Sequence, residues 1–132
     1  MGILNVTPDS FFDGGKYYDI EDALNRARKM IDDGADIIDI GGESTRPNST
    51  YVSAEEEARR IVPVIKELSK EIQIPISIDT YKSEVADKAI KAGAQIINDI
   101  SGLQADKEMV RVAAANNTPI IIMHIRGRPH DF

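Results

Sequence analysis

The chain has 132 residues, of which 42% are hydrophobic and 29% charged, enough to bury the core of one small domain. Its 22 acidic and 16 basic residues give a net charge of −6, which argues against a duplex-binding or membrane-surface protein. It contains no cysteine, no apolar run as long as the roughly 18 residues of a membrane helix and no N-terminal signal pattern, so we expect a cytoplasmic location.

Short β-branched runs alternate with longer helical patterns along the chain. The runs are apolar on both faces, which is typical of buried strands in a parallel sheet. They comprise Ile3-Leu4, Ile37 to Ile40, Ile74 to Ile78, Ile96-Ile97 and Ile120 to Met123. Strands that alternate with helices indicate βα units with right-handed crossovers. We therefore predict an α/β fold.

The first two helical patterns follow the first two runs. Between Ile20 and Ile31 the apolar residues fall on one helical face. Ser53 has the spacing of a capping box to Glu56 and opens a second helix, in which Pro63 should produce a kink. The acidic residues 55–57 are expected to form the solvated first turn of this helix.

Two further helices are predicted after the third and fourth runs. Ser83 is expected to cap a helix that ends at Gly93. Asp106 is expected to cap another helix, which runs to about Asn116.

A six-residue pattern, Gly-Ala-X-Ile-Ile-Asx, occurs twice, at 34–39 and 93–98. Its glycine suits the left-handed turn after a helix, and its alanine permits close packing where the next strand begins. The Gly-Ala pair is common in αβ connections. The informative residues are Asp39 and Asn98, because each ends a strand with a polar side chain.

Each of the five runs has a polar residue within its carboxyl end or directly after it. The residues in these positions are Asn5, Asp39, Asp79, Asn98 and His124. Ligands of parallel barrels and open α/β sheets bind at the carboxyl ends of the strands. We therefore predict one ligand site at that end of the sheet.

Each side chain suits a particular chemistry. Asp79 can bind an amidine-like pair of N–H groups or stabilise a positive charge, although it could instead cap the next helix. Asn98 offers a donor and an acceptor to an amide-like ring edge. Asn5 offers Mg²⁺ an oxygen ligand, and a plain turn residue is the equal alternative. Arg46 suits a carboxylate or phosphate, whereas a solvated loop arginine is the alternative.

Two residues near the fifth run are harder to assign. His124 suits a base or phosphate ligand, although a histidine packed beside the core is the commoner case. Met123 is expected to pack, with a flat ring as one candidate partner.

Taken together, these motifs resemble the dihydropteroate synthases, a family of pterin-binding enzymes. The matching stretches span the chain in the order and spacing of the family. They are Asn5 to Phe11, Asp39 to Pro47, Ser77 to Thr80, Asn98 to Gly102, and Met123-His124 with Gly127 and Pro129. The first two motifs together are highly specific.

The resemblance implies a (β/α)8 barrel, of which residues 1–132 form the N-terminal portion of one domain, with five parallel strands and four helices. The implied reaction joins 6-hydroxymethyl-7,8-dihydropterin diphosphate to p-aminobenzoate, giving dihydropteroate and diphosphate in folate biosynthesis. Asp79 and Asn98 are implied to hold the pterin ring, and Met123 to line its pocket. Asn5 is implied to bind Mg²⁺ at the diphosphate end. No nucleic acid or membrane partner is expected.

Two loops complete the implied site. Thr45, Arg46 and Pro47 lie on a loop that orders the diphosphate and forms the aminobenzoate site, and Arg46 is counted with Asp79 and Asn98 as catalytic. Phe11, with Phe12, is predicted to close over the substrates and exclude water, which would otherwise trap a pterin cation. A groove-filling or subunit-contact role is the alternative for this pair.

The family pattern continues beyond Phe132 with a further pterin-contacting Asp, a Lys loop and an Arg-X-His phosphate anchor. Because these elements have no counterpart here, we expect this chain alone to have little or no activity. It derives from a longer protein, needs a complementary chain, or forms a homodimer, which is the partner we expect. Two other functions stay open: a methyltetrahydrofolate-dependent methyltransferase, and a non-catalytic, self-associating half-barrel.

Overall fold

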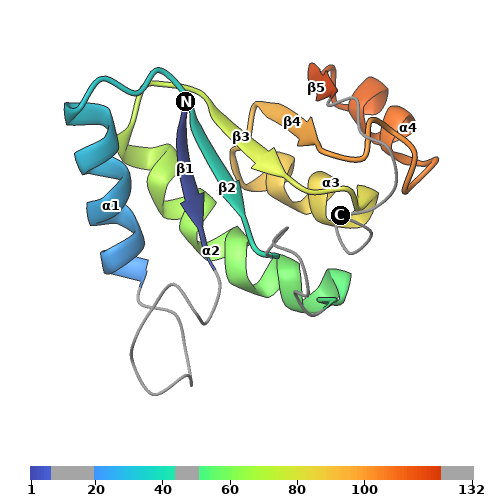
Figure 1. Cartoon of the computed structure of the whole chain (residues 1–132), viewed down its shortest axis with the longest axis horizontal. Helices are drawn as coiled ribbons and strands as arrows, with labels where there is room; N and C mark the ends of the chain where they lie inside the picture. Colours follow the sequence, from blue (N-terminus) through green and yellow to red (C-terminus); the bar gives the residue numbers. More distant parts are fainter. Residues whose placement is uncertain (7–19, 44–50, 123–132) are drawn as a thin grey trace.

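The sheet of this protein is built from strands that follow one another in space as they do in sequence. The computed structural model describes residues 1–6, 20–43 and 51–122 (Figure 1). In chain order the described elements are β1 (Gly2–Asn5), α1 (Ile20–Asp32), β2 (Ile38–Gly41), α2 (Ala54–Glu71), β3 (Ile76–Asp79), α3 (Ser83–Ala92), β4 (Ile96–Asp99), α4 (Met109–Ala115) and β5 (Ile120–Ile122).

All neighbouring strands are parallel, in the order β1-β2-β3-β4-β5. Each strand is joined to the next through a helix, and the helices also neighbour one another in sequence order along one side of the sheet (Figure 1). This is how successive βα units of a (β/α)8 barrel are arranged. The prediction of five parallel strands and four helices is confirmed.

Alternate strand residues point to opposite sides of the sheet. One row faces the helices and forms the core, in which isoleucines such as Ile40, Ile78 and Ile97 are fully buried. The other row carries Asp39 and Ser77 on the central strands, and both are buried although they are polar. The sequence therefore places an apolar layer toward the helices and polar groups on the opposite face.

The expectation that every strand is buried on both faces is wrong at the two outer strands. β2 is buried throughout, but Ile3 of β1 is 59% exposed and Ile122 of β5 is 56% exposed. Within the described residues, β1 and β5 each have one neighbouring strand rather than two. An apolar run predicts the strand but cannot tell which strands lie at the outside.

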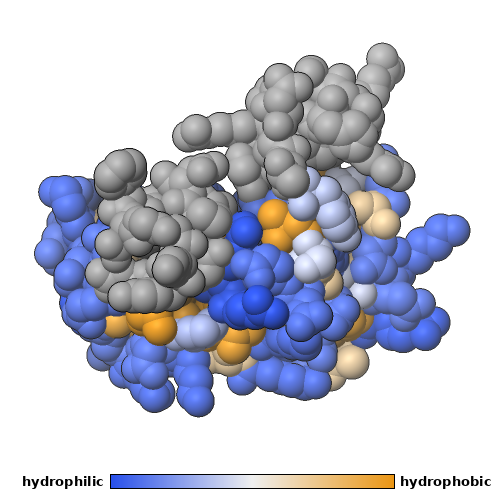
Figure 2. All heavy atoms as spheres, turned by 90° about the horizontal axis from the view of Figure 1, so that it is seen from below, coloured by the Kyte–Doolittle hydropathy of each residue, from blue (hydrophilic) through white to orange (hydrophobic). Residues whose placement is uncertain are grey.

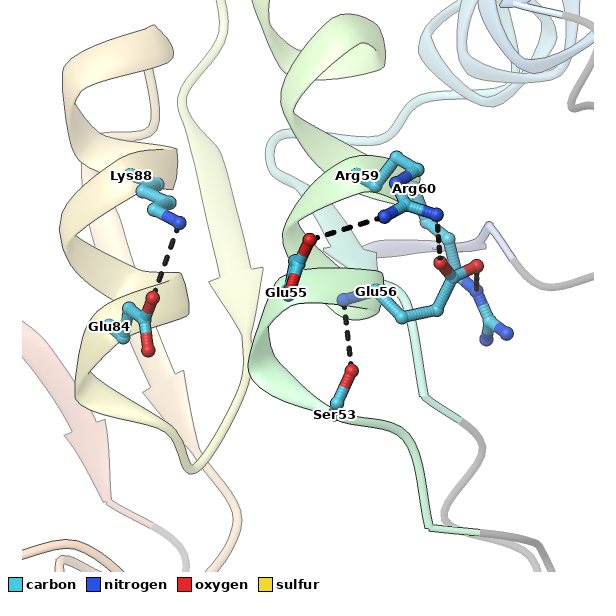
Figure 3. A network of polar contacts seen from close by, with 7 residues as sticks. All are labelled: Ser53, Glu55, Glu56, Arg59, Arg60, Glu84 and Lys88. Atoms are coloured by element: carbon cyan, nitrogen blue, oxygen red, sulfur yellow. Dashed lines mark hydrogen bonds and ion pairs between the residues drawn. The ribbon is translucent and has the colours of Figure 1, made fainter.

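The beginning of α2 follows the predicted capping box. The hydroxyl of Ser53 accepts a hydrogen bond from the backbone N–H of Glu56 at 3.1 Å (Figure 3). Glu56 also pairs with Arg59 and Arg60 one turn further on. The helix continues through Pro63 to Glu71 as one element. Proline removes a single intrahelical hydrogen bond, and the buried apolar face of α2 offsets that loss.

The predicted cap of α3 is wrong. Ser83 is the first residue of the helix, and Lys82, in the capping position, makes no side-chain capping bond. Instead, the carboxylate of Asp106 accepts from the N–H of Ser83 at 2.7 Å and from the N–H of Glu108 at 2.9 Å. Asp106 therefore caps α3 from a distant segment, while α4 begins later than predicted, at Met109.

The surface agrees with the composition. The coloured part of the face in Figure 2 is mostly hydrophilic, with smaller hydrophobic areas between the hydrophilic ones. Among residues 1–6, 20–43 and 51–122, no helix combines the length and the apolar character that crossing a membrane requires.

Candidate active site at the carboxyl ends of the strands

Three predicted site residues lie in one row at the carboxyl ends of the strands. Asn5 is the register partner of Gly41, Gly41 of Asp79, and Asp79 of Asn98. Residues that are direct partners in a parallel sheet point to the same face. The predicted meeting of Asn5, Asp79 and Asn98 at one end of the sheet is therefore confirmed.

Asp79 is the acid of this row, and the pKa of its carboxyl is strongly raised. Burial raises the pKa of its carboxyl, and the nearby carboxylates of Asp39, Glu57, Asp99 and Glu43 raise it further, to about 7. A carboxyl in such surroundings binds a ligand cation or a pair of N–H donors favourably, because either relieves the repulsion from its acidic neighbours.

A glycine, Gly41, lies beside Asp79 in the sheet. A Cβ atom placed on Gly41 would lie 3.4 Å from both the Cβ and a carboxylate oxygen of Asp79. A side chain at position 41 would therefore be in direct contact with the carboxyl of Asp79.

The last residues of the two copies of the six-residue pattern, Asp39 and Asn98, are in contact in the structure. Gly34 and Gly93 have φ angles of +107° and +133°, the left-handed region predicted for them. The side-chain amide of Asn98 donates to Asp39 at 3.2 Å. The hydroxyl of Ser77, on the strand between them, donates to the other oxygen of Asp39 at 2.5 Å.

This network fixes the direction of the Asn98 amide. Its nitrogen donates to Asp39, so its oxygen is the acceptor left for a ligand. Burial raises the pKa of Asp39, and the hydrogen bonds from Ser77 and Asn98 offset part of that rise. Asp39 is thus a buried polar residue that positions Asn98, as well as one of the charges acting on Asp79.

A second polar cluster lies beside the row and centres on Lys82. Its ammonium pairs with Glu43, after β2, and with Glu57 of α2, the latter at 2.6 Å. It also lies 4.7 Å and 4.6 Å from the ring centroids of Tyr51 and Tyr81. Tyr81 donates its hydroxyl to Glu43 at 2.6 Å. We call these five residues the Lys82 cluster.

Sequence reasoning missed the Lys82 cluster. It assigned Glu57 to the solvated first turn of a helix, whereas Glu57 is only 1% exposed. The helical spacing could have indicated that Glu57 is buried, because Glu57 lies four residues before Ile61 on the buried stripe of α2. The partner of a buried acid cannot be found from such spacing, because Lys82 is 25 residues away.

Several predicted site residues lie outside the described residues. These are Phe11, Phe12, Thr45, Arg46, Pro47, Met123 and His124. Their assignments stay predictions.

The predicted Mg²⁺ ligand, Asn5, is exposed at the end of β1 in the row of Asp79. Within the described ranges, no group of three or more His, Cys, Asp or Glu side chains could hold a metal ion. An exposed single amide fits a hard cation that keeps most of its waters and shares substrate phosphate oxygens. It does not fit an all-protein metal cage.

Comparison with known proteins gives consistent matches over the whole chain. The family model for pterin binding enzymes matches residues 1–132. Dihydropteroate synthase from Bacillus subtilis is 62% identical over 126 residues, which are 96% of this chain and 44% of the relative. The enzyme of the same name from Clostridium beijerinckii is 59% identical, over 96% of this chain and 47% of the relative.

Solved structures agree. Dihydropteroate synthase from Clostridium difficile, crystallised in the presence of pteroic acid, superposes with a TM-score of 0.91 at 54% identity, over 95% of this chain and 48% of that chain. The Xanthomonas albilineans enzyme with 4-aminobenzoic acid gives 0.88 at 45% identity, over 96% and 46%. The chain spans about half the length of the curated relatives it matches. From its sequence, its parallel βα units and these matches, the chain belongs to the family of pterin-binding enzymes.

Proposed function

We propose that this chain supplies the pterin-binding side of a dihydropteroate synthase. The reaction joins 6-hydroxymethyl-7,8-dihydropterin diphosphate to p-aminobenzoate and releases diphosphate. The observation that carries the proposal is the row Asn5, Asp79 and Asn98, in which the carboxyl with a pKa of about 7 stands beside a fixed amide. The dihydropteroate synthase names of the matched relatives support the same assignment.

In this proposal, Asp79 and Asn98 recognise the pterin ring. The ring presents an amidine-like pair of N–H groups, which the Asp79 carboxylate accepts in a charge-assisted manner. The oxygen of Asn98, whose nitrogen is held by Asp39, accepts a further ring N–H. Binding therefore replaces the repulsion among the acids with hydrogen bonds to a flat, donor-rich ligand.

The chemical step breaks the bond between the pterin methylene carbon and the diphosphate oxygen, and the electron pair leaves with the diphosphate. The amine nitrogen of p-aminobenzoate then forms the new bond to that carbon and loses a proton to solvent. Asp79 stabilises the positive charge that the pterin develops between these events. Departure before attack is a hypothesis, and an isotope-exchange experiment in the absence of amine checks it.

Asn5 is proposed to hold Mg²⁺ together with substrate oxygens. Magnesium, when bound, supplies positive charge that offsets the negative charge of the diphosphate. The position of Asn5 at the end of β1, in the row of Asp79, supports this assignment. The homodimer and the cytoplasmic location stay predictions from the sequence.

The proposal is tested by measuring diphosphate release from the natural full-length protein supplied with both substrates. We expect release that depends on p-aminobenzoate and falls at least a hundredfold in Asp79→Ala. The exposed Asp33→Ala is the matched control. Pterin binding without any release would instead support a non-catalytic binding module, and methyl transfer from methyltetrahydrofolate would support the methyltransferase.

A further inference from the structure

The Lys82 cluster holds both ends of one segment of the chain. Glu43 is the last described residue before residues 44–50, and Tyr51 is the first described residue after them. The ammonium of Lys82 pairs with the carboxylate of Glu43 and lies 4.7 Å from the ring centroid of Tyr51. One cation therefore contacts both residues that flank this segment.

Two further contacts hold Gly42 and Glu43, the residues after β2. The guanidinium of Arg60 donates to the carbonyl oxygen of Gly42, the residue before Glu43, at 2.8 Å. The hydroxyl of Tyr81 donates to Glu43 at 2.6 Å. The end of β2 is thus fixed from α2 through Arg60 and from the start of α3 through Tyr81 and Lys82.

Lys82 itself is rigidly held. It is only 8% exposed, and its second carboxylate partner, Glu57, is almost completely buried in α2. Burial alone would lower the pKa of Lys82, but the hydrogen bonds and charges of Glu43 and Glu57 outweigh it, so the pKa is raised. The ammonium stays charged throughout the physiological pH range.

Lys82, which holds Glu43 and Tyr51, lies close in the sequence to Asp79 of the row formed by Asn5, Asp79 and Asn98. Only Thr80 and Tyr81 separate it from Asp79 in the sequence. Its backbone N–H donates to the hydroxyl oxygen of Thr80 at 3.2 Å, and the N–H of Thr80 donates to the carbonyl of Asn98 at 3.2 Å. Residues 79–82 therefore carry both the carboxyl of Asp79 and the cation that contacts Glu43 and Tyr51.

A buried ion pair of this kind is weak evidence for stability, because desolvation offsets much of the attraction. What it supplies is a defined geometry, since the ammonium must satisfy two carboxylates from separate elements. We propose that Lys82 is a positioning residue, which sets the places of Glu43 and Tyr51 relative to Asp79 and so the affinity for the second substrate. This inference rests on the proposed function, in which that substrate is p-aminobenzoate.

The two carboxylate partners of Lys82 separate positioning from mere stability. Glu43→Gln and Glu57→Gln each remove one negative charge from the same ammonium, but only Glu43 flanks the segment 44–50. In the natural full-length enzyme, we expect Glu43→Gln to raise the KM for p-aminobenzoate about tenfold, with the Kd for the pterin substrate within twofold. Glu57→Gln leaves the pair between Lys82 and Glu43 in place, so it should lower Tm more and raise that KM less than threefold.

Variants of Lys82 itself provide a second test in the same KM measurement. Lys82→Met keeps most of the side-chain length, loses the charge and should raise the same KM, whereas Lys82→Arg should recover at least half of the loss. Lys88→Met is the control, because Lys88 is an exposed lysine of α3 that pairs with the exposed Glu84 one turn away (Figure 3). An equal effect of Glu43→Gln and Glu57→Gln on KM, or of Lys82→Met and Lys88→Met, would overturn the proposal.

A measurement without catalysis keeps this inference separate from the proposed function. Nitrogen-15 relaxation of the backbone amides of Glu43 and Tyr51 reports the motion of the two residues that Lys82 contacts. We expect lower order parameters at both amides in Lys82→Met and unchanged values in Lys88→Met. Unchanged values in Lys82→Met would refute the positioning role, even if the enzyme makes dihydropteroate. Lower values in an enzyme without diphosphate release would refute only the proposed function.

Discussion

The side-chain nitrogen of Asn98 on β4 lies 3.2 Å from a carboxylate oxygen of Asp39 on β2, a hydrogen bond that reaches across β3. The two residues end the two copies of the repeated sequence pattern. Asp39 thereby determines which way the amide of Asn98 points.

The first prediction concerns this contact. Asp39→Asn can still bond to its neighbours, but it no longer dictates the orientation of the Asn98 amide. We expect about tenfold weaker pterin binding with a loss of folding stability of about 1 kcal/mol. Ser77→Ala is the control, because it removes the other bond to Asp39 at 2.5 Å and leaves the Asn98 contact in place. Equal losses of binding in the two variants would contradict a specific role for Asp39.

The second prediction concerns stability and the pKa of Asp79. Because folding raises this pKa from 3.8 to about 7, the stabilising contribution is full below pH 3.8 and is lost as pH rises through 7. Asp79→Asn has no carboxyl to ionise, so it should become more stable than the wild type as pH rises. The difference should reach roughly 2 to 4 kcal/mol at pH 8. Urea unfolding at several pH values measures it, and a difference that does not vary with pH would contradict the raised pKa.

The third prediction concerns the two adjacent glycines after β2. A Cβ atom on Gly42 would lie 3.0 Å from a methyl carbon of Ile61 and 3.1 Å from the carbonyl oxygen of Glu57, which is closer than side chains normally pack. We expect Gly42→Ala to lower the free energy of unfolding by about 1 to 3 kcal/mol. Gly41→Ala makes only ordinary contacts, starting at 3.4 Å, and should change stability by less than about 0.5 kcal/mol. The reverse order in chemical denaturation would show that the packing of β2 on α2 is described wrongly.

The fourth prediction concerns Asp106, which accepts from the N–H groups of Ser83 and Glu108. Asp106→Ala leaves the beginning of α3 uncapped and should cost about 1 to 2 kcal/mol. The exposed neighbour Lys107→Ala should cost nothing measurable. Burial alone would raise the pKa of Asp106, but its hydrogen bonds to Ser83 and Glu108 outweigh it and lower the pKa. The stabilisation should therefore be present above pH 3.8 and disappear below it, and thermal melts from pH 2 to 7 check this.

Much of the fold could be predicted because its signals are local. Short β-branched runs between amphipathic stretches indicate βα units, and parallel strands that succeed one another bring their carboxyl ends together. That is why Asn5, Asp79 and Asn98 could be assigned to one end of the sheet from sequence order alone. The left-handed turns at Gly34 and Gly93 could be predicted for the same local reason.

What sequence reasoning missed depends on partners distant in the chain. Glu57 resembles its exposed neighbours in the sequence, and only the packing of α2 against the residue at position 82 makes it a buried ion-pair partner. Ser83 has the residue type of a helix cap, yet Asp106, 23 residues away, takes that role. A pattern of residue types specifies elements, whereas charge pairs and caps between elements depend on how those elements pack.

The central claim is that Asp79 and Asn98 form one pterin site, and calorimetric titration of 6-hydroxymethylpterin into the full-length protein tests it most directly. Ring N–H groups should bind the ionised carboxyl and lower its pKa from about 7, so binding at pH 6 should release a proton and affinity should rise about tenfold from pH 6 to pH 8. Asp79→Asn should abolish both the proton release and the pH dependence. Equal affinity at both pH values in the wild type, or a variant that binds as the wild type does, would contradict the account.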